Sequence, residues 1–203
     1  EKDGLLPNYF AEGGGEHAYN TVDTALWYFW AVQQMLKYTG DMEAVEENMW
    51  PAMKRIISTY MVGTSFNIGM DNRGLLYAGD GWHALTWMDA IVHGRPVTPR
   101  HGIPVEINAL WYNALSFYAE LAQRFEEPPL FPEDLLARLR KAFKETFWIE
   151  EEGYLGDVYC DGVLDRTIRP NQILAVSLPF SPLEPYQWKG IVSCTRNHLL
   201  TPV

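Results

Sequence analysis

Cysteine, basic residues and long apolar runs are all scarce in this sequence of 203 residues. The two cysteines, Cys160 and Cys194, have no metal-binding or redox spacing, which excludes a disulfide-stabilised scaffold. Sixteen Lys and Arg stand against 26 Asp and Glu, a formal net charge of −10, so the surface repels nucleic-acid phosphates and anionic lipids. No apolar run reaches the roughly 18 residues of a membrane-spanning helix. We therefore expect no nucleic-acid partner and no membrane partner.

Several catalytic and targeting signals are also missing. The N-terminal stretch EKDGLLPNYF has no basic-then-apolar signal pattern, which predicts a cytoplasmic protein. The five histidines form no HExxH or similar ligand spacing, so we expect no bound metal. The stretch EGGGEH lacks the GK[ST] ending of a phosphate-binding loop, and no G-x-S-x-G nucleophile motif occurs.

Aromatic residues are abundant, at 14% of the chain with eight Trp. Trp and Tyr present a flat apolar face together with a polar tip, which suits a large packed core and equally suits a cleft that stacks against sugar rings. The composition leaves both interpretations open. Nothing resembles a linker between two cores, so we predict a single domain over residues 1–203.

Two kinds of helix alternate along the chain. An inner kind is apolar on nearly every face, as expected of a helix buried all round, and an outer kind has one apolar stripe. The predicted inner helices span residues 21–39, 104–122 and 171–178, and the outer helices span residues 42–61, 132–147 and 186–200. Gly-containing turns at DGLL (3–6), RGLL (73–76) and EGYL (152–155) predict a short β-hairpin before each inner helix.

Helix pairs that repeat in this way must stack on one another, either in an open solenoid or in a closed ring. The inner helices are too uniformly apolar to line the exposed concave face of a solenoid. We therefore predict an all-α fold, a closed α/α toroid to which this chain contributes three inner/outer pairs with short hairpins. The N-termini of the inner helices would then converge at one rim.

The second repeat carries an insertion before its inner helix, DGWHALTWMDAIVHGRPVTPRHG (80–102). Long loops on a rigid scaffold are where function concentrates. Asp89 follows Trp87 and Met88, and an acid packed among such side chains at a partly dry rim would keep its proton more readily, as a general acid requires. The alternative interpretation is that Asp89 caps a short helix, MDAIV.

Four segments resemble one enzyme family: YNTVDTALWYFWAV, LTWMDA, VTPRHGIPVEINALWYNAL and RPNQILAVSLP. They are similar to the C-terminal glucosidase domain of glycogen debranching enzymes, the amylo-α-1,6-glucosidase family, and the likeness runs from Asp3 to the end. The resemblance implies an (α/α)6 toroid that hydrolyses the α-1,6-linked glucose left at a trimmed glycogen branch. It also implies inversion at the anomeric carbon by an acid and a separate base, an α-glucan partner (glycogen or limit dextrin), and no cofactor.

Carried over to this sequence, the resemblance gives Asp89 as the general acid. The implied glucose-binding residues are Asp23, Trp87, Arg100, His101, Glu106, Asn108 and Trp111. Carboxylates and amides can bind sugar hydroxyls in pairs while an aromatic face covers the ring.

The chain stops after about six helices where a closed toroid has about twelve. We therefore expect the N-terminal portion of a catalytic domain, inactive alone and lacking the general base, with Glu106 or Asp23 as less favoured bases. The exposed apolar flank of a partial toroid favours a homo-oligomer. A glucan-binding scaffold without catalysis, or a sugar epimerase using rim histidines such as His83 and His101, are the alternative functions.

Overall fold

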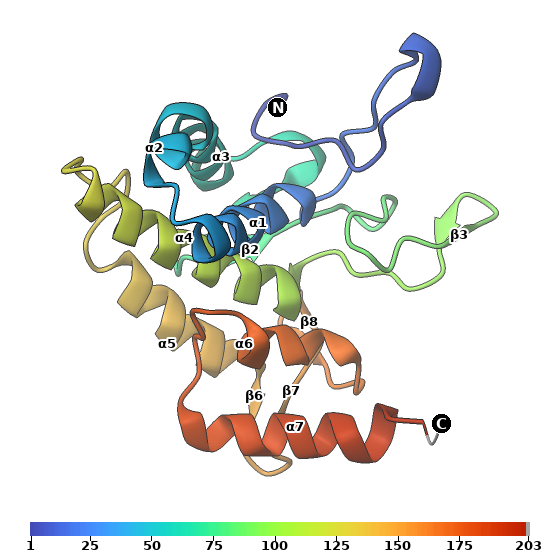
Figure 1. Ribbon diagram of the computed structural model, residues 1–203. Helices are drawn as coiled ribbons and strands as arrows, with labels where there is room; N and C mark the ends of the chain where they lie inside the picture. Colours follow the sequence, from blue (N-terminus) through green and yellow to red (C-terminus); the bar gives the residue numbers. More distant parts are fainter. Residues whose placement is uncertain (202–203) are drawn as a thin grey trace.

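The computed structural model describes residues 1–201, and about half of this part is helical (Figure 1). The connections between helices form four small antiparallel sheets. The prediction of an all-α class is therefore wrong, because the connecting segments pair as strands over more residues than their Gly-containing turns indicated. The alternation of inner and outer helices is present as predicted, whereas a closed toroid stays a prediction.

The inner helices are α1 (Thr24–Thr39), α4 (Val105–Arg124) and a short third unit in which the 3-10 helix η4 (Pro170–Ile173) continues into α6 (Leu174–Ser177). α4 packs against both α1 and the η4–α6 unit. In Figure 1 the N-terminal ends of all three face the same side, which is also the side where β3 protrudes. The predicted rim of helix N-termini is thus present.

Each inner helix packs against an outer helical unit that follows it in the chain. The outer helices are α2 (Met42–Ala44), which runs through a π-helical stretch η2 (Val45–Met49) into α3 (Trp50–Val62), then α5 (Leu135–Phe147) and α7 (Pro185–Leu199). Pro51 lies in the first turn of α3, and because it has no backbone N–H it donates no hydrogen bond back into the π-helical stretch that precedes it. The predicted stripe of α5, from Leu135 to Phe147, is fully buried.

Two predicted hairpins follow an outer helix and precede an inner one. They are β1–β2 (Gly69–Met70 with Leu76–Tyr77) and β6–β7 (Trp148–Ile149 with Tyr154–Leu155). The hairpin expected at residues 3–6 is reduced to a single bridge between Lys2 and Leu5. Two short 3-10 helices, η1 (Glu12–Gly14) and η3 (Ser65–Asn67), complete the connections.

Two further sheets were not predicted. The hairpin β3–β4 (Ile91–Val92 with Arg95–Pro96) lies within the insertion, and β5 (Ile103–Pro104) pairs with β8 (Val158–Cys160), which pairs with β9 (Val163–Asp165). The second sheet joins the segment entering α4 to the third repeat. This sheet therefore connects the second and third repeats at the N-terminal end of α4.

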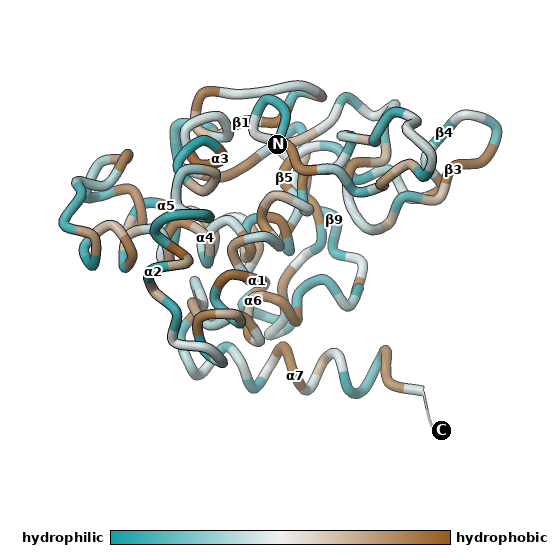
Figure 2. Tube along the Cα trace, turned by 45° about the horizontal axis from the view of Figure 1, so that its top comes forward, coloured by the Kyte–Doolittle hydropathy of each residue, from teal (hydrophilic) through white to brown (hydrophobic). Residues whose placement is uncertain are grey.

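Figure 2 shows α7 along one edge and the β3–β4 hairpin, with its hydrophobic β3, projecting from the body. Within residues 1–201, no helix is long and apolar enough to cross a membrane.

Candidate active site at the ends of the inner helices

A short segment of the insertion, Leu85–Met88, is fixed to the ends of all three inner helices. The carbonyl of Leu85 accepts a 2.9 Å hydrogen bond from the backbone N–H of Val22, just before α1. The hydroxyl of Thr86 accepts from Arg100, at 3.2 Å, and Arg100 in turn binds Glu106 in the first turn of α4. The indole N–H of Trp87 donates to Oδ1 of Asn171 in η4, at 2.8 Å. The next residue along the chain after this segment is Asp89.

Asp89 lies at the point where the insertion leaves the rim. Residues 88–90 are irregular and Ile91 begins strand β3, so there is no helix MDAIV for Asp89 to cap, and that alternative is wrong. Asp89 is also exposed, because the β3–β4 hairpin turns away from the body. The dry surroundings that the sequence predicts for this acid are therefore not formed by residues 1–201.

Asp23 occupies the N-cap position of α1 but does not act as a cap. Its side chain makes no capping hydrogen bond, and the residue is 9% exposed. Burial raises the pKa of Asp23 above its ordinary value; hydrogen bonds from Thr21 and from the backbone oppose the rise without cancelling it, and the negative charge of Asp89 adds a smaller rise. The structure thus brings two predicted site carboxylates within electrostatic range of each other, one buried and one exposed.

Beneath the segment lies a buried cluster of charges centred on Arg100. Its Nη2 donates to Glu106 Oε2 at 2.6 Å and its Nη1 donates to Oε1, so both carboxylate oxygens of Glu106 are engaged. Asp157 accepts two more bonds from the same guanidinium, each of 2.9 Å. Burial lowers the pKa of Arg100, but the bonds and charges of these two carboxylates outweigh it and raise the pKa above its ordinary value. Arg100 and Glu106 therefore satisfy each other rather than facing a ligand.

Asp157 is the residue of this cluster that the sequence did not reveal. It is 2% exposed and also accepts hydrogen bonds from Arg169 and Asn171, each of 2.7 Å. Arg169 reaches further to Asp165, whose pKa falls to about 2 because hydrogen bonds from Thr167 and Arg169 outweigh its partial burial. A lone Asp after a hairpin carries no motif, and only the tertiary contacts identify it.

Two predicted sugar ligands lie inside the core. Asn108 is fully buried. Its Oδ1 accepts a hydrogen bond from the backbone N–H of Leu76, and its Nδ2 donates to the carbonyls of Leu76 and Pro104. Trp111 is fully buried as well, with its indole N–H donating to the carbonyl of Gly74 at 3.1 Å. Both side chains hold the β1–β2 hairpin against α4, and neither presents a surface to a ligand in the structure.

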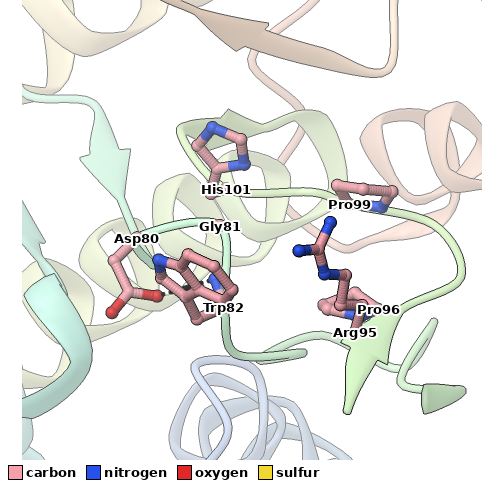
Figure 3. Close-up of a pocket in the computed structure, with 7 residues that line it drawn as sticks. All are labelled: Asp80, Gly81, Trp82, Arg95, Pro96, Pro99 and His101. Carbon is pink, nitrogen blue, oxygen red and sulfur yellow. Dashed lines mark hydrogen bonds between the residues drawn. The ribbon is translucent and has the colours of Figure 1, made fainter. Parts of the chain in front are cut away.

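The two remaining predicted residues, Trp87 and His101, both reach the surface. Trp87 is 56% exposed, and its N–H is held by Asn171. His101 is half-buried and lines an open pocket of about 370 Å³ within the insertion, where the guanidinium of Arg95 lies 5.6 Å from the ring centre of Trp82 (Figure 3). The Nδ1 atom of His101 is buried without a hydrogen-bond partner among the described residues.

The arrangement of helix pairs and hairpins is shared with a glycosidase of known structure. A rhamnosidase from Klebsiella oxytoca with rhamnose bound superposes with a TM-score of 0.63 at 17% sequence identity, over 97% of this chain and 35% of the rhamnosidase chain. The chain therefore has the fold of the matching part of that rhamnosidase. A sequence profile of the family described as amylo-alpha-1,6-glucosidase matches residues 1–203, and the chain belongs to that family. No curated protein sequence is significantly similar to the chain.

The chain is shorter than the rhamnosidase with which it shares its fold. It spans about a third of the rhamnosidase to which it is similar.

Proposed function

We propose that this chain is the part of an amylo-α-1,6-glucosidase that binds the α-1,6-linked glucose of a branch and supplies the proton donor, Asp89. The family membership supports the reaction class. The observation that carries the assignment of Asp89 is the attachment of the preceding residues, 85–88, to the ends of the three inner helices.

In the proposed reaction, Asp89 donates its proton to the glycosidic oxygen as the bond from that oxygen to the anomeric carbon breaks. A water molecule attacks the anomeric carbon from the opposite face and loses its proton to a general base. The products are free glucose of inverted configuration and a shortened α-glucan. The exposed position of Asp89 leaves room for the sugar and for further protein atoms around the acid.

Asp23 and Trp87 are proposed as ligands of the glucose unit. The Asp23 carboxylate forms no ion pair within the described residues, and its oxygens have lone pairs beyond those bonded by Thr21 and the backbone, so it can also accept hydrogen bonds from sugar hydroxyls. The exposed indole of Trp87 can cover an apolar face of the ring.

Glu106 is a poor candidate for the base, because Arg100 occupies both of its oxygens. Asp23 is proposed as a ligand instead. We therefore propose that the base comes from outside residues 1–201.

The proposal is tested by incubating the full-length gene product with a phosphorylase limit dextrin and following the released sugar by ¹H NMR. Release of glucose that first appears as the β-anomer is the expected result, since inversion of an α-linkage gives β-glucose. First appearance as the α-anomer would contradict the inverting mechanism. Binding of the dextrin without glucose release would favour the scaffold function instead.

A further inference from the structure

Asn171 makes two bonds that together link the insertion to the buried charge cluster. Its Oδ1 accepts from the indole N–H of Trp87 at 2.8 Å, and its Nδ2 donates to Asp157 at 2.7 Å. The same Nδ2 lies 3.6 Å from the sulfur of Met88. Asn171 is 3% exposed, and its bond to Asp157 is buried, whereas its contacts to Trp87 and Met88 are partly buried. Its side chain thus touches both residues that directly precede Asp89 along the chain.

The orientation of this amide is fixed by its surroundings. The carboxylate of Asp157 can only accept, so the NH₂ group of Asn171 must face it, and the oxygen must face the indole, which can only donate. Asp157 is itself fixed by Arg100 and Arg169. A chain of contacts therefore runs from the buried Arg100 and the partly buried Arg169 through Asp157 and Asn171 to Trp87.

The insertion has few other restraints near this point. Asp89 is exposed, and the β3–β4 hairpin that follows is exposed along β3. The last contact before Asp89 that fixes the backbone to a helix end is therefore the one through Asn171.

We propose that Asn171 is a positioning residue that holds Trp87, and through it the carboxyl group of Asp89, in place at the rim. This inference rests on the proposed role of Asp89 as the acid. Misplacing a catalytic group by about 1 Å can lower a rate by about 100-fold. Asn171 therefore acts on the proton-transfer step without touching the substrate.

The test compares Asn171→Ala with Gln172→Ala in the full-length gene product. Gln172 is the matched control: it lies in the same turn, is 1% exposed, and also makes two hydrogen bonds, to Leu155 and Arg169, but none to residues 85–89. Glucose release from limit dextrin gives kcat and KM. ¹⁹F NMR of 5-fluorotryptophan-labelled protein reports the environment of Trp87, whose signal is identified by its loss in Trp87→Phe.

We expect Asn171→Ala to lower kcat by about 10- to 100-fold and to shift the Trp87 signal. Gln172→Ala should change neither, even if both variants lose thermal stability. In a Trp87→Phe background the kcat effect of Asn171→Ala should largely vanish, because the two substitutions remove the same bond.

A shifted Trp87 signal with kcat unchanged would overturn the positioning role, and so would equal kcat losses in the Asn171 and Gln172 variants. If the unsubstituted protein releases no glucose, the proposed function fails on its own. The Trp87 signal then still decides whether Asn171 holds this segment: a shift in Asn171→Ala supports the contact, and an unchanged signal overturns it.

Discussion

At the scale of single residues, the site is divided between side chains held in a buried set of ion pairs and side chains that form no ion pair. Arg100, Glu106 and Asp157 are bonded to one another and buried. Among the described residues, Asp23 and Asp89 form no ion pair, and the indole face of Trp87 is exposed although its N–H is held by Asn171. The first group supports the rim and the second is available for chemistry.

Asp157 should be the most sensitive of the supporting residues. Removing one member of a buried ion cluster leaves the others as uncompensated charges, at a cost of about 3–5 kcal/mol. We expect Asp157→Ala to lower the free energy of unfolding by this amount in urea titrations followed by circular dichroism. Asp134→Asn, which breaks an exposed pair with Arg138, should cost less than about 1 kcal/mol. Equal effects of the two substitutions would show that the cluster contributes no more than a surface pair.

Removing the charge of Asp23 should stabilise the fold, whereas removing that of Asp157 destabilises it, because the pKa of Asp23 is raised mainly by burial and further by Asp89. A carboxyl whose folded-state pKa lies above its unfolded value stabilises the fold at low pH, and this contribution is lost as the pH rises through the folded-state pKa. We therefore expect Asp23→Asn to be more stable than the unsubstituted protein at pH 7. The advantage should disappear below pH about 4, near the ordinary pKa of Asp.

The same substitution should weaken glucose binding. Loss of a charged hydrogen-bond acceptor corresponds to about 1.5–3 kcal/mol, or roughly 10- to 100-fold in Kd. Isothermal titration with a branched dextrin measures this. A variant that is less stable at pH 7 but binds normally would instead make Asp23 a structural residue.

At the scale of elements, the outer helix α7 depends on a close approach to the β6–β7 hairpin. A methyl group at Gly190 would overlap the carbonyl oxygen of Gly153 in the hairpin turn. Alanine normally favours a helix over glycine by about 1 kcal/mol, but here the overlap with backbone should dominate. We expect Gly190→Ala to lower the midpoint of thermal unfolding, corresponding to about 1–3 kcal/mol.

Ser193, exposed on the same helix, provides the control. Ser193→Ala should be neutral or stabilising by a few tenths of a kcal/mol. A stabilising Gly190→Ala would mean that α7 can move away from the hairpin without loss.

The elements themselves were largely predictable because helical periodicity is a local signal. The expected helices at residues 21–39, 104–122 and 132–147 correspond to α1, α4 and α5 with shifts of a few residues. The three-stranded sheet was missed because β5 and β8 are more than 50 residues apart in sequence, and such pairing leaves no periodic trace in strands of two or three residues.

The site was less predictable for the same reason. The sequence placed Asp23, Trp87 and Asp89 at one rim. In the structure Asp23 directly precedes α1, Trp87 bonds to Asn171 in η4, and Asp89 lies within electrostatic range of Asp23, while their roles stay predictions. The sequence could not distinguish a sugar ligand from a side chain that anchors the core. Asn108 and Trp111 both have a polar group and lie in the N-terminal half of an inner helix, but in the structure their hydrogen bonds go to backbone atoms. Asp157 became visible only through contacts across repeats.

At the scale of the whole molecule, two helices leave apolar side chains uncovered. Trp30 on α1 is 38% exposed, and on α7 the side chains of Tyr186, Trp188 and Val192 are 37–67% exposed. We propose that these surfaces pair with a second copy when the 203-residue chain is studied alone.

Sedimentation velocity over a range of concentrations measures this association. We expect concentration-dependent dimers that Trp188→Glu abolishes, while Val62→Glu, at the exposed end of α3, leaves them intact. A monomer at all concentrations would remove the proposed contact.

The central claim is that Asp89 is the proton donor, and glucose release from limit dextrin by full-length Asp89→Asn tests it most directly. We predict a fall in kcat of about two to four orders of magnitude with dextrin binding retained. Asp161→Asn, at the exposed turn between β8 and β9, should keep the normal rate. An unchanged kcat in Asp89→Asn would contradict the account and place the acid elsewhere.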